Sequence, residues 1–257
     1  HTRHAADSPG SNCTNCHMPH TSYGLLKAIR GHTIETPDVA TTLATGRPNA
    51  CNLCHLDKTL DWTAEQLAKR TGQAKPTVPG EHRTTAASVL WLLKGDAGQR
   101  ALAAWHMGWQ PALEASGSGW QQPLLAELLN DPYSAVRYMA HKALARQPGF
   151  GEFEYDFVAD EPARLAKRKA ALAKWKPFCV QNTGLTSPSF IENVTTSNSS
   201  INSPRLKKPR SISSSGLSEC CLAASAKLAP STSCCRTLHS ALKIASRFST
   251  SRIDLKM

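Results

Sequence analysis

The sequence predicts a mainly α-helical protein built from three segments of different character. Residues 79–177 carry apolar residues at helical spacing. Residues 1–78 are rich in His, Cys, Thr and Pro and hold few apolar residues, so we expect a loop-rich segment that folds around disulfides, a metal or another bound group. Both patterns stop near Phe178, and residues 178–257 are Ser-rich and show no periodicity.

The middle segment divides into three helical stretches. "GEHRTTAASVLWLLKG" predicts a helix that ends at Gly95, and "DAGQRALAAWHMGW" predicts a second one. "WQQPLLAELLNDPYSAVRYMAHKALARQPGF" predicts a helix, a turn over residues 130–133, and another helix. The stretch "DPYSAVRYMAHKAL" resembles a HEAT-type repeat, in which an Asp-Pro turn leads into a helix with Val and Arg early in it. A plain helical bundle is the alternative for residues 79–177.

The last segment holds most of the basic charge. Ten of its residues are Lys or Arg and three are Asp or Glu, so it carries +7 of the net +11 and leaves +4 for residues 1–177. The folded part is therefore not expected to bind nucleic acid. The composition of residues 178–257 predicts disorder, or a tail translated out of frame. The chain has no run of about 18 apolar residues, so no membrane-spanning helix is predicted, and its start at His1 predicts a processed or truncated end.

One five-residue motif occurs twice in the first segment. "CTNCH" spans residues 13–17 and "CNLCH" spans residues 51–55. From composition, one such motif should occur by chance in roughly one chain in a hundred of this length, and two in roughly one in ten thousand. A zinc site could use all four cysteines, but the separation of the two pairs exceeds the usual spacing and zinc does not need the histidines. A redox-active thiol pair would need a long helix after the motif, and Pro19 follows Cys16 too closely.

The spacing favours covalent attachment of haem. Two cysteines three positions apart lie on one side of a helical turn, where their thiols can add to the two vinyl groups of haem. The next histidine then reaches the iron as its proximal ligand. The sequence therefore predicts two haem c groups, the first held by Cys13 and Cys16 with His17, and the second by Cys51 and Cys54 with His55.

Several stretches together resemble the doubled-CXXCH family of multihaem c-type cytochromes with a C-terminal helical repeat. They are "CTNCHMPHTSY", "GHTIETPDVATTLATGRPNACNLCHLDKTLDW", "DPYSAVRYMAHKAL" and "PGFGEFEYDF", and the likeness covers about residues 1–175. The resemblance implies a haem-organised N-terminal segment, export to the bacterial periplasm, and electron transfer through bis-histidine haems. It also implies that further haem motifs lie upstream of His1, so that the chain is a C-terminal fragment.

The second axial ligands are harder to assign from sequence. Met18 and His20 cannot reach the far face of the haem held by His17, although His20 could reach a neighbouring haem. His32 is the best distal candidate, because the loop after it can fold back over a ring, and the resemblance supports it. His4, and less surely His1, could cap this haem pair or an upstream haem. Histidines 82, 106 and 141 fall on predicted helices and are expected to be exposed or hydrogen-bonded, while Met107 is expected in the core.

The predicted function is electron transfer to redox partner proteins, in the periplasm, with the helical repeat as the docking surface and a membrane-associated electron-transfer complex as one setting. The alternative is part of a multihaem reductase acting on nitrite, hydroxylamine or a sulfur oxyanion, with a catalytic haem upstream. The chain contains no Cys-x-x-Cys-Lys motif, so we predict no catalytic residue in it. A third interpretation makes the helical segment a protein-binding module with structural haems.

Overall fold

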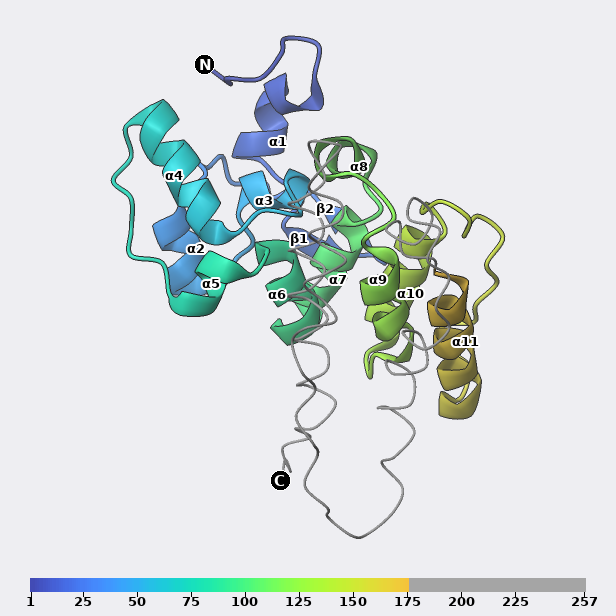
Figure 1. The fold of residues 1–257 in the computed structure, drawn as a ribbon. Helices are drawn as coiled ribbons and strands as arrows, with labels where there is room; N and C mark the ends of the chain where they lie inside the picture. The colour runs from blue at the N-terminus through green and yellow to red at the C-terminus, as the bar shows by residue number, and fades with distance from the viewer. Residues whose placement is uncertain (176–257) are drawn as a thin grey trace, which may run out of the picture. The chain divides into compact units, whose positions relative to one another are not determined.

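Helices account for most of residues 1–175, the part of the chain that the computed structural model describes (Figure 1). The prediction of a mainly α-helical fold is confirmed for these residues. They form a single compact unit. The predictions made for residues 178–257 lie outside the described residues.

The first half of this unit contains short elements joined by long connections. In chain order they are η1 (Pro9–Ser11), α1 (Cys13–His17), β1 (Ser22–Gly24), β2 (Lys27–Ile29), α2 (Val39–Thr45), α3 (Ala50–Cys54), α4 (Leu60–Thr71) and α5 (Gly80–Thr84). The second half is more continuously helical. Its elements are α6 (Ala87–Lys94), α7 (Ala97–His106), α8 (Gln110–Ser116), α9 (Gln122–Glu127), η2 (Leu128–Asn130), α10 (Ser134–Leu144) and α11 (Glu161–Lys174).

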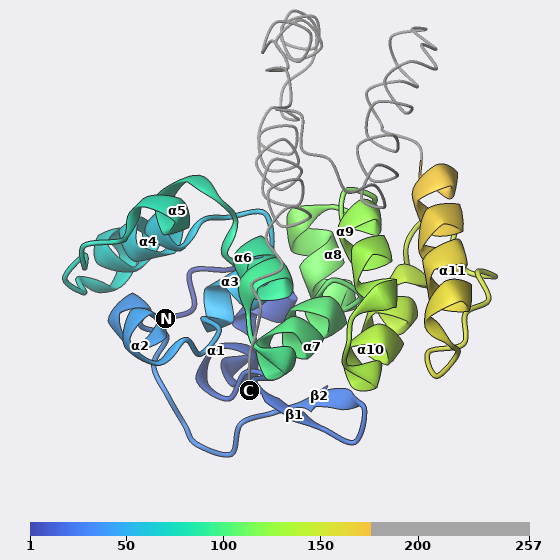
Figure 2. The ribbon, with the colours of Figure 1, turned by 90° about the horizontal axis from the view of Figure 1, so that it is seen from below.

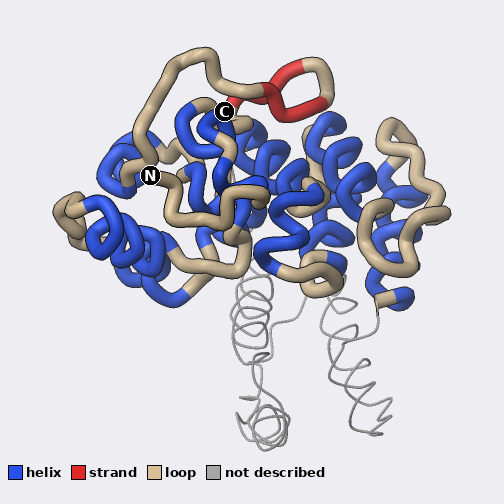
Figure 3. The backbone as a smooth tube through the Cα atoms, turned by 90° about the horizontal axis from the view of Figure 1, so that it is seen from above, coloured by secondary structure: helices blue, strands red, loops and turns tan. Residues whose placement is uncertain are grey.

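The two strands form a small antiparallel hairpin that lies against α7 (Figures 2 and 3). Tyr23 pairs with Ala28, and the two-residue turn consists of Leu25 and Leu26. Both leucines have positive φ, 50° and 54°, which is the backbone of a type I′ turn. This turn was not predicted, because the sequence has no Gly or Asn at these positions to signal it.

The first half is more helical than its composition predicts. The longest helix there is α4, which begins at the Thr59 side chain, an acceptor for the Trp62 amide, and ends at Gly72 in the left-handed conformation. Only Leu60, Thr63 and Ala64 on it are buried. The helix is polar on average, and the sequence analysis judged residues 1–78 by composition, so it missed this helix.

The helices predicted in the second half are confirmed. Helix α6 ends at Lys94 with Gly95 as its cap, and α9 with η2 is followed by a turn and then by α10. The core lies among these helices, and its fully buried side chains include Leu92, Leu124, Leu125, Leu129, Met139 and Leu144. Met107 is also fully buried, as predicted. Helices α8 and α11 were not predicted, and each buries only one residue, an alanine.

The turn before α10 is held by charged side chains. Arg137 donates from Nη1 to the carbonyl oxygens of Asp131 (2.8 Å) and Pro132 (3.1 Å). The Asp131 carboxylate accepts two hydrogen bonds from Arg100 on α7, at 2.7 and 3.1 Å. These bonds give the Asp-Pro turn and the early Arg of "DPYSAVR" a physical role. Whether α9 and α10 form a HEAT-type repeat stays a prediction.

Polar contacts join the two halves into one unit. The Ser88 hydroxyl at the start of α6 donates to the Leu56 carbonyl at 2.5 Å, and the Ala87 amide donates to Lys58 at 3.0 Å. The side chain of Gln99 on α7 donates to the Gly46 carbonyl. The segment that carries the CXXCH motifs therefore rests on the helical half.

A substitution at Gly108, just after α7, can test how closely the end of α7 packs against α10. A Cβ at Gly108 would lie 2.6 Å from the Cα of Ala143 on α10. Because backbone cannot yield like a side chain, we expect G108A to lower the free energy of unfolding by about 1–3 kcal/mol. Chemical denaturation measures this change. G151A is the matched control, since nothing lies within 4 Å of its added methyl group; an equal loss in both variants would contradict the close approach.

Candidate functional site

The four cysteines of the CXXCH motifs lie on two short helices. The Asn12 side chain caps α1 by accepting from the Thr14 amide at 3.0 Å, and the Asn49 side chain caps α3 by accepting from the Cys51 amide at 3.0 Å. Each helix is about one turn long, so its two cysteines share a side. All four thiols are free.

Helices α1 and α3 lie against each other, so the two motifs share one site. Burial raises the pKa of Cys51 and of Cys54 to about 12, and the neighbouring Cys16 contributes to both shifts. Burial likewise raises the pKa of Cys16, with Cys13 as the second cause. Within residues 1–175 no three His, Cys, Asp or Glu side chains are arranged to hold a metal ion between them. The arrangement is therefore two adjacent cysteine pairs, rather than a four-cysteine cluster.

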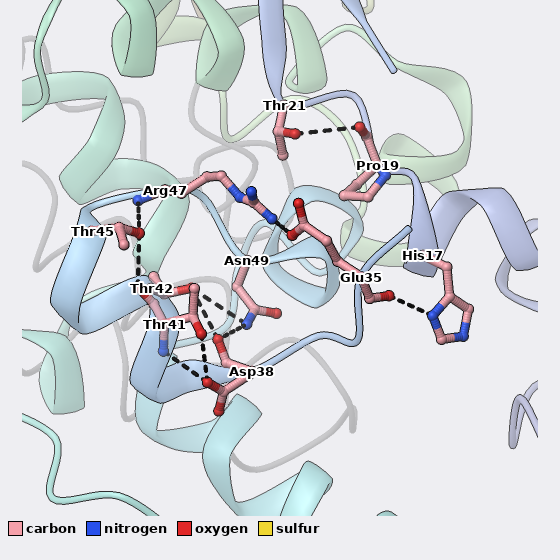
Figure 4. A network of polar contacts seen from close by, with 10 residues as sticks. All are labelled: His17, Pro19, Thr21, Glu35, Asp38, Thr41, Thr42, Thr45, Arg47 and Asn49. Atoms are coloured by element: carbon pink, nitrogen blue, oxygen red, sulfur yellow. Dashed lines mark hydrogen bonds and ion pairs between the residues drawn. The ribbon is translucent and has the colours of Figure 1, made fainter. Parts of the chain in front are cut away.

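His17 is held on both sides by the backbone of Glu35. Its Nδ1 lies 2.5 Å from the Glu35 carbonyl oxygen, and the Glu35 amide donates to the His17 carbonyl oxygen at 2.8 Å. Figure 4 shows the His17 ring directed at this carbonyl. Since a carbonyl only accepts, Nδ1 carries a proton and donates it to the Glu35 carbonyl. This contact orients the ring and leaves Nε2 as the ring nitrogen that is not engaged by Glu35.

Arg30 fixes the end of α1 from the β hairpin. Its guanidinium donates to the carbonyl oxygens of Thr14 (2.7 Å) and Met18 (3.1 Å) and to the Asn15 side chain (2.7 Å). The Thr14 carbonyl thereby accepts a second hydrogen bond beside that from the Met18 amide, and the Met18 carbonyl, just past the helix end, gains a donor. Sequence analysis missed Arg30, and no local pattern could have revealed it, because the residues it binds are 12 to 16 positions away.

His55 is held mainly by burial. It caps the end of α3, where its amide donates to the Cys51 carbonyl at 2.8 Å, and its ring lies 5.1 Å from the Trp62 ring. Burial lowers the pKa of His55, against a smaller opposing effect of Asp57. The neutral imidazole is therefore favoured, and this is the form that binds a metal.

The N-terminal stretch His1–His4 supplies one histidine to each motif. The His1 ring lies 5.8 Å from the His17 ring, and the His4 ring lies 6.3 Å from the His55 ring, with interplanar angles of 21° and 22°. His4 is itself oriented, because its Nδ1 lies 2.8 Å from the Thr2 carbonyl oxygen. Gly10 leaves room for this ring, since a Cβ there would lie 2.4 Å from it. The sequence analysis ranked His4 below His32 and His1 lower still.

The other two candidate ligands lie elsewhere. His20 packs against Trp105, Trp109 and His106 of the helical half, at ring distances of 4.9, 5.3 and 6.2 Å. His32 is exposed on the connection between β2 and α2. Among residues 1–175 the structure pairs neither His20 nor His32 with the ring of His17 or of His55. Whether His20 or His32 binds an iron stays a prediction.

His106 and His141 are hydrogen-bonded, as predicted, whereas the Nδ1 of His82 is buried without a hydrogen-bond partner within residues 1–175, so the prediction for His82 is not met. His141 Nε2 lies 2.7 Å from the Phe153 carbonyl oxygen. His106 is fully buried and its Nδ1 lies 2.8 Å from the Leu102 carbonyl, but its Nε2 has no hydrogen-bond partner. Burial lowers the pKa of His106 to about 3, and burial together with Arg30 lowers that of His20 to about 4. His82 is half-buried.

Burial of neutral His106 should make stability depend on pH. In the folded chain His106 stays neutral down to about pH 3, whereas in the unfolded chain it takes up a proton near its ordinary pKa of 6.5. The unfolded state therefore binds more protons in this window, and the free energy of unfolding falls as pH drops. H106Q lacks this proton uptake, so its stability difference from the native chain should shrink by about 2 kcal/mol between pH 7 and pH 5. Urea denaturation at both pH values measures it; an unchanged difference would contradict the prediction.

Comparison of the chain with protein-family models, with curated proteins and with solved structures finds no match. The chemistry of the site therefore has to be argued from its own residues. In the described part of the chain, no helix is both long enough and apolar enough to cross a membrane.

Proposed function

We propose that residues 1–175 form a dihaem c-type cytochrome unit that transfers electrons. The main observation behind this proposal is that the ring of each CXXCH histidine lies beside the ring of one histidine from the His1–His4 stretch. In this proposal Cys13 and Cys16 hold one haem c with His17 as proximal ligand. The second haem c is held by Cys51, Cys54 and His55.

The residues present fit covalent haem. Both cysteine pairs are free thiols that share one side of a helical turn, as two thioether bonds to one porphyrin require. The histidine at the end of each helix could bind iron through Nε2: the Glu35 carbonyl accepts from Nδ1 of His17 and orients that ring, and burial favours the neutral form of His55.

His1 and His4 are the residues that could supply a second ligand to each iron. In each pair the two rings are stacked, with their planes within 22° of parallel. The observed distances are 5.8 and 6.3 Å. Ordinary aromatic pairs cover this range too. What favours ligation is that two separate pairs both join a CXXCH histidine to the same short stretch.

Filled axial positions favour electron transfer over substrate binding. A haem with two histidine ligands supplies one-electron chemistry and leaves no site on its iron for a substrate. The chain contributes the ligands, their orientation and the partial burial of the site. The helical half, on which the segment with the motif helices rests, would then present the surface that docks a redox partner, and haem c attachment would put the protein in a bacterial periplasm. The alternative, a reductase, would need a further haem with an open axial site.

Haem stoichiometry tests the proposal. Expressed in the periplasm of a host that attaches haem c, the chain should carry two covalent haems, measured by a pyridine haemochrome assay against protein concentration. The double variants C13A/C16A and C51A/C54A should each carry one. If the unsubstituted chain carries no covalent haem, the proposal is refuted.

Axial ligation is tested by removing one histidine at a time. H1A and H4A should each convert one haem from low-spin to high-spin or water-ligated iron, seen in absorption and electron paramagnetic resonance spectra. H32A is the matched control and should leave both haems low-spin, because His32 lies away from both pairs. A high-spin signal in H32A alone would restore His32 as a ligand of this haem pair and refute the pairing proposed for His1 and His4.

A further inference from the structure

The two proximal histidines are held in different ways. The His17 ring has its Nδ1 2.5 Å from the Glu35 carbonyl, and the Glu35 amide closes a second bond to the His17 backbone. The His55 ring packs against Trp62, and within residues 1–175 the structure gives its ring nitrogens no hydrogen bond. The two sites therefore differ in the contact that sets imidazole orientation and basicity.

Glu35 has no regular element to hold it in place. It lies on the connection between β2 and α2, and its side chain forms an ion pair with Arg47, which follows α2 (Figure 4). The same connection is tied to the start of α2 by Asp38, whose carboxylate accepts from the amides of Ala40 (3.1 Å) and Thr41 (2.8 Å). The ion pair therefore links Glu35, which precedes α2, to Arg47, which follows α2.

We propose that Arg47 is a positioning residue for His17, acting through Glu35. The ion pair keeps the Glu35 carbonyl in line with Nδ1, and this hydrogen bond makes the imidazole more basic. A more basic axial ligand favours oxidised iron, so the haem on His17 has a lower reduction potential than it would have without the pair. This inference rests on the proposed haem ligation. In this inference the "HTIETP" stretch contributes to the His17 site through the backbone carbonyl of Glu35.

The expected effect is modest because the ion pair is partly exposed. The side chains of Arg47 and Glu35 are 40% and 27% exposed, and pairs of this kind bias a local geometry only weakly. Loss of the pair should weaken the preference of the His17 site for oxidised iron by up to about fivefold, which is about 40 mV upward for a one-electron couple.

The experiment compares R47Q, E35Q and the double variant R47Q/E35Q in the full chain with its haems. Each single variant changes the charge near the haem, whereas the double variant removes one charge of each sign, so its potential reports position rather than net charge. Spectropotentiometry should show the wave of the His17 haem moving upward in the double variant, while the wave of the His55 haem stays in place. R168Q is the matched control, since it breaks a similarly exposed ion pair with Glu127 on the helical half, and R47K should restore most of the shift.

A second readout separates this inference from the proposed function. Nitrogen-15 NMR of the His17 ring in the reduced, diamagnetic protein should show protonated Nδ1, with its hydrogen-bonded proton signal weakened in R47Q and in the double variant. If the chain carries no covalent haem, the proposed function fails, and the same NMR comparison on the haem-free chain still decides the contact. An unaltered Nδ1 signal and an unaltered potential in R47Q/E35Q would overturn the role of Arg47.

Discussion

The burial of α3 is the constraint on which the site depends. Its Asn52 and Leu53 point into the protein with 0% and 2% of their surface exposed, while Cys51 and Cys54 on the same short helix remain half-buried. Asn52 accepts a hydrogen bond from the Thr63 hydroxyl at 2.7 Å and donates to the Lys58 carbonyl at 3.1 Å. A single helical turn is too short to be stable alone, so these tertiary contacts give α3 its conformation. One face of α3 is therefore anchored while the other presents the motif.

The other motif helix is anchored by polar groups instead. No residue of α1 is buried, and its end is fixed by Arg30 and by the backbone of Glu35. This difference makes α1 more dependent on neighbouring loops than α3 is. A bound haem would add the apolar surface that residues 1–78 lack, so in the proposed function the fold of this segment and its cofactor are coupled.

The first half of the unit, which carries the CXXCH motifs, meets the helical half around His20. This residue follows the first motif, yet its ring lies among Trp105, His106 and Trp109. From sequence alone it was a candidate ligand for a neighbouring haem. The structure gives it a packing contact between the halves, where burial lowers its pKa to about 4, and its role as a ligand stays a prediction. His17 and His20 thus have different surroundings, although they lie three positions apart, because only His17 ends a motif helix.

The sequence alone determined the helical class, the helices α6, α7, α9 and α10, and the chemistry predicted for the two CXXCH motifs, because helical periodicity and cysteine spacing are local properties of the chain. The helices α4, α8 and α11 were missed because they bury few residues, and α4 and α11 are polar on average. Tertiary structure decided which histidines face His17 and His55, and it brought Glu35, Arg47 and Arg30 to the site. Such pairings join residues up to 51 positions apart, as with His4 and His55. No local pattern encodes them, because they depend on how the connecting loops fold back over the motif helices.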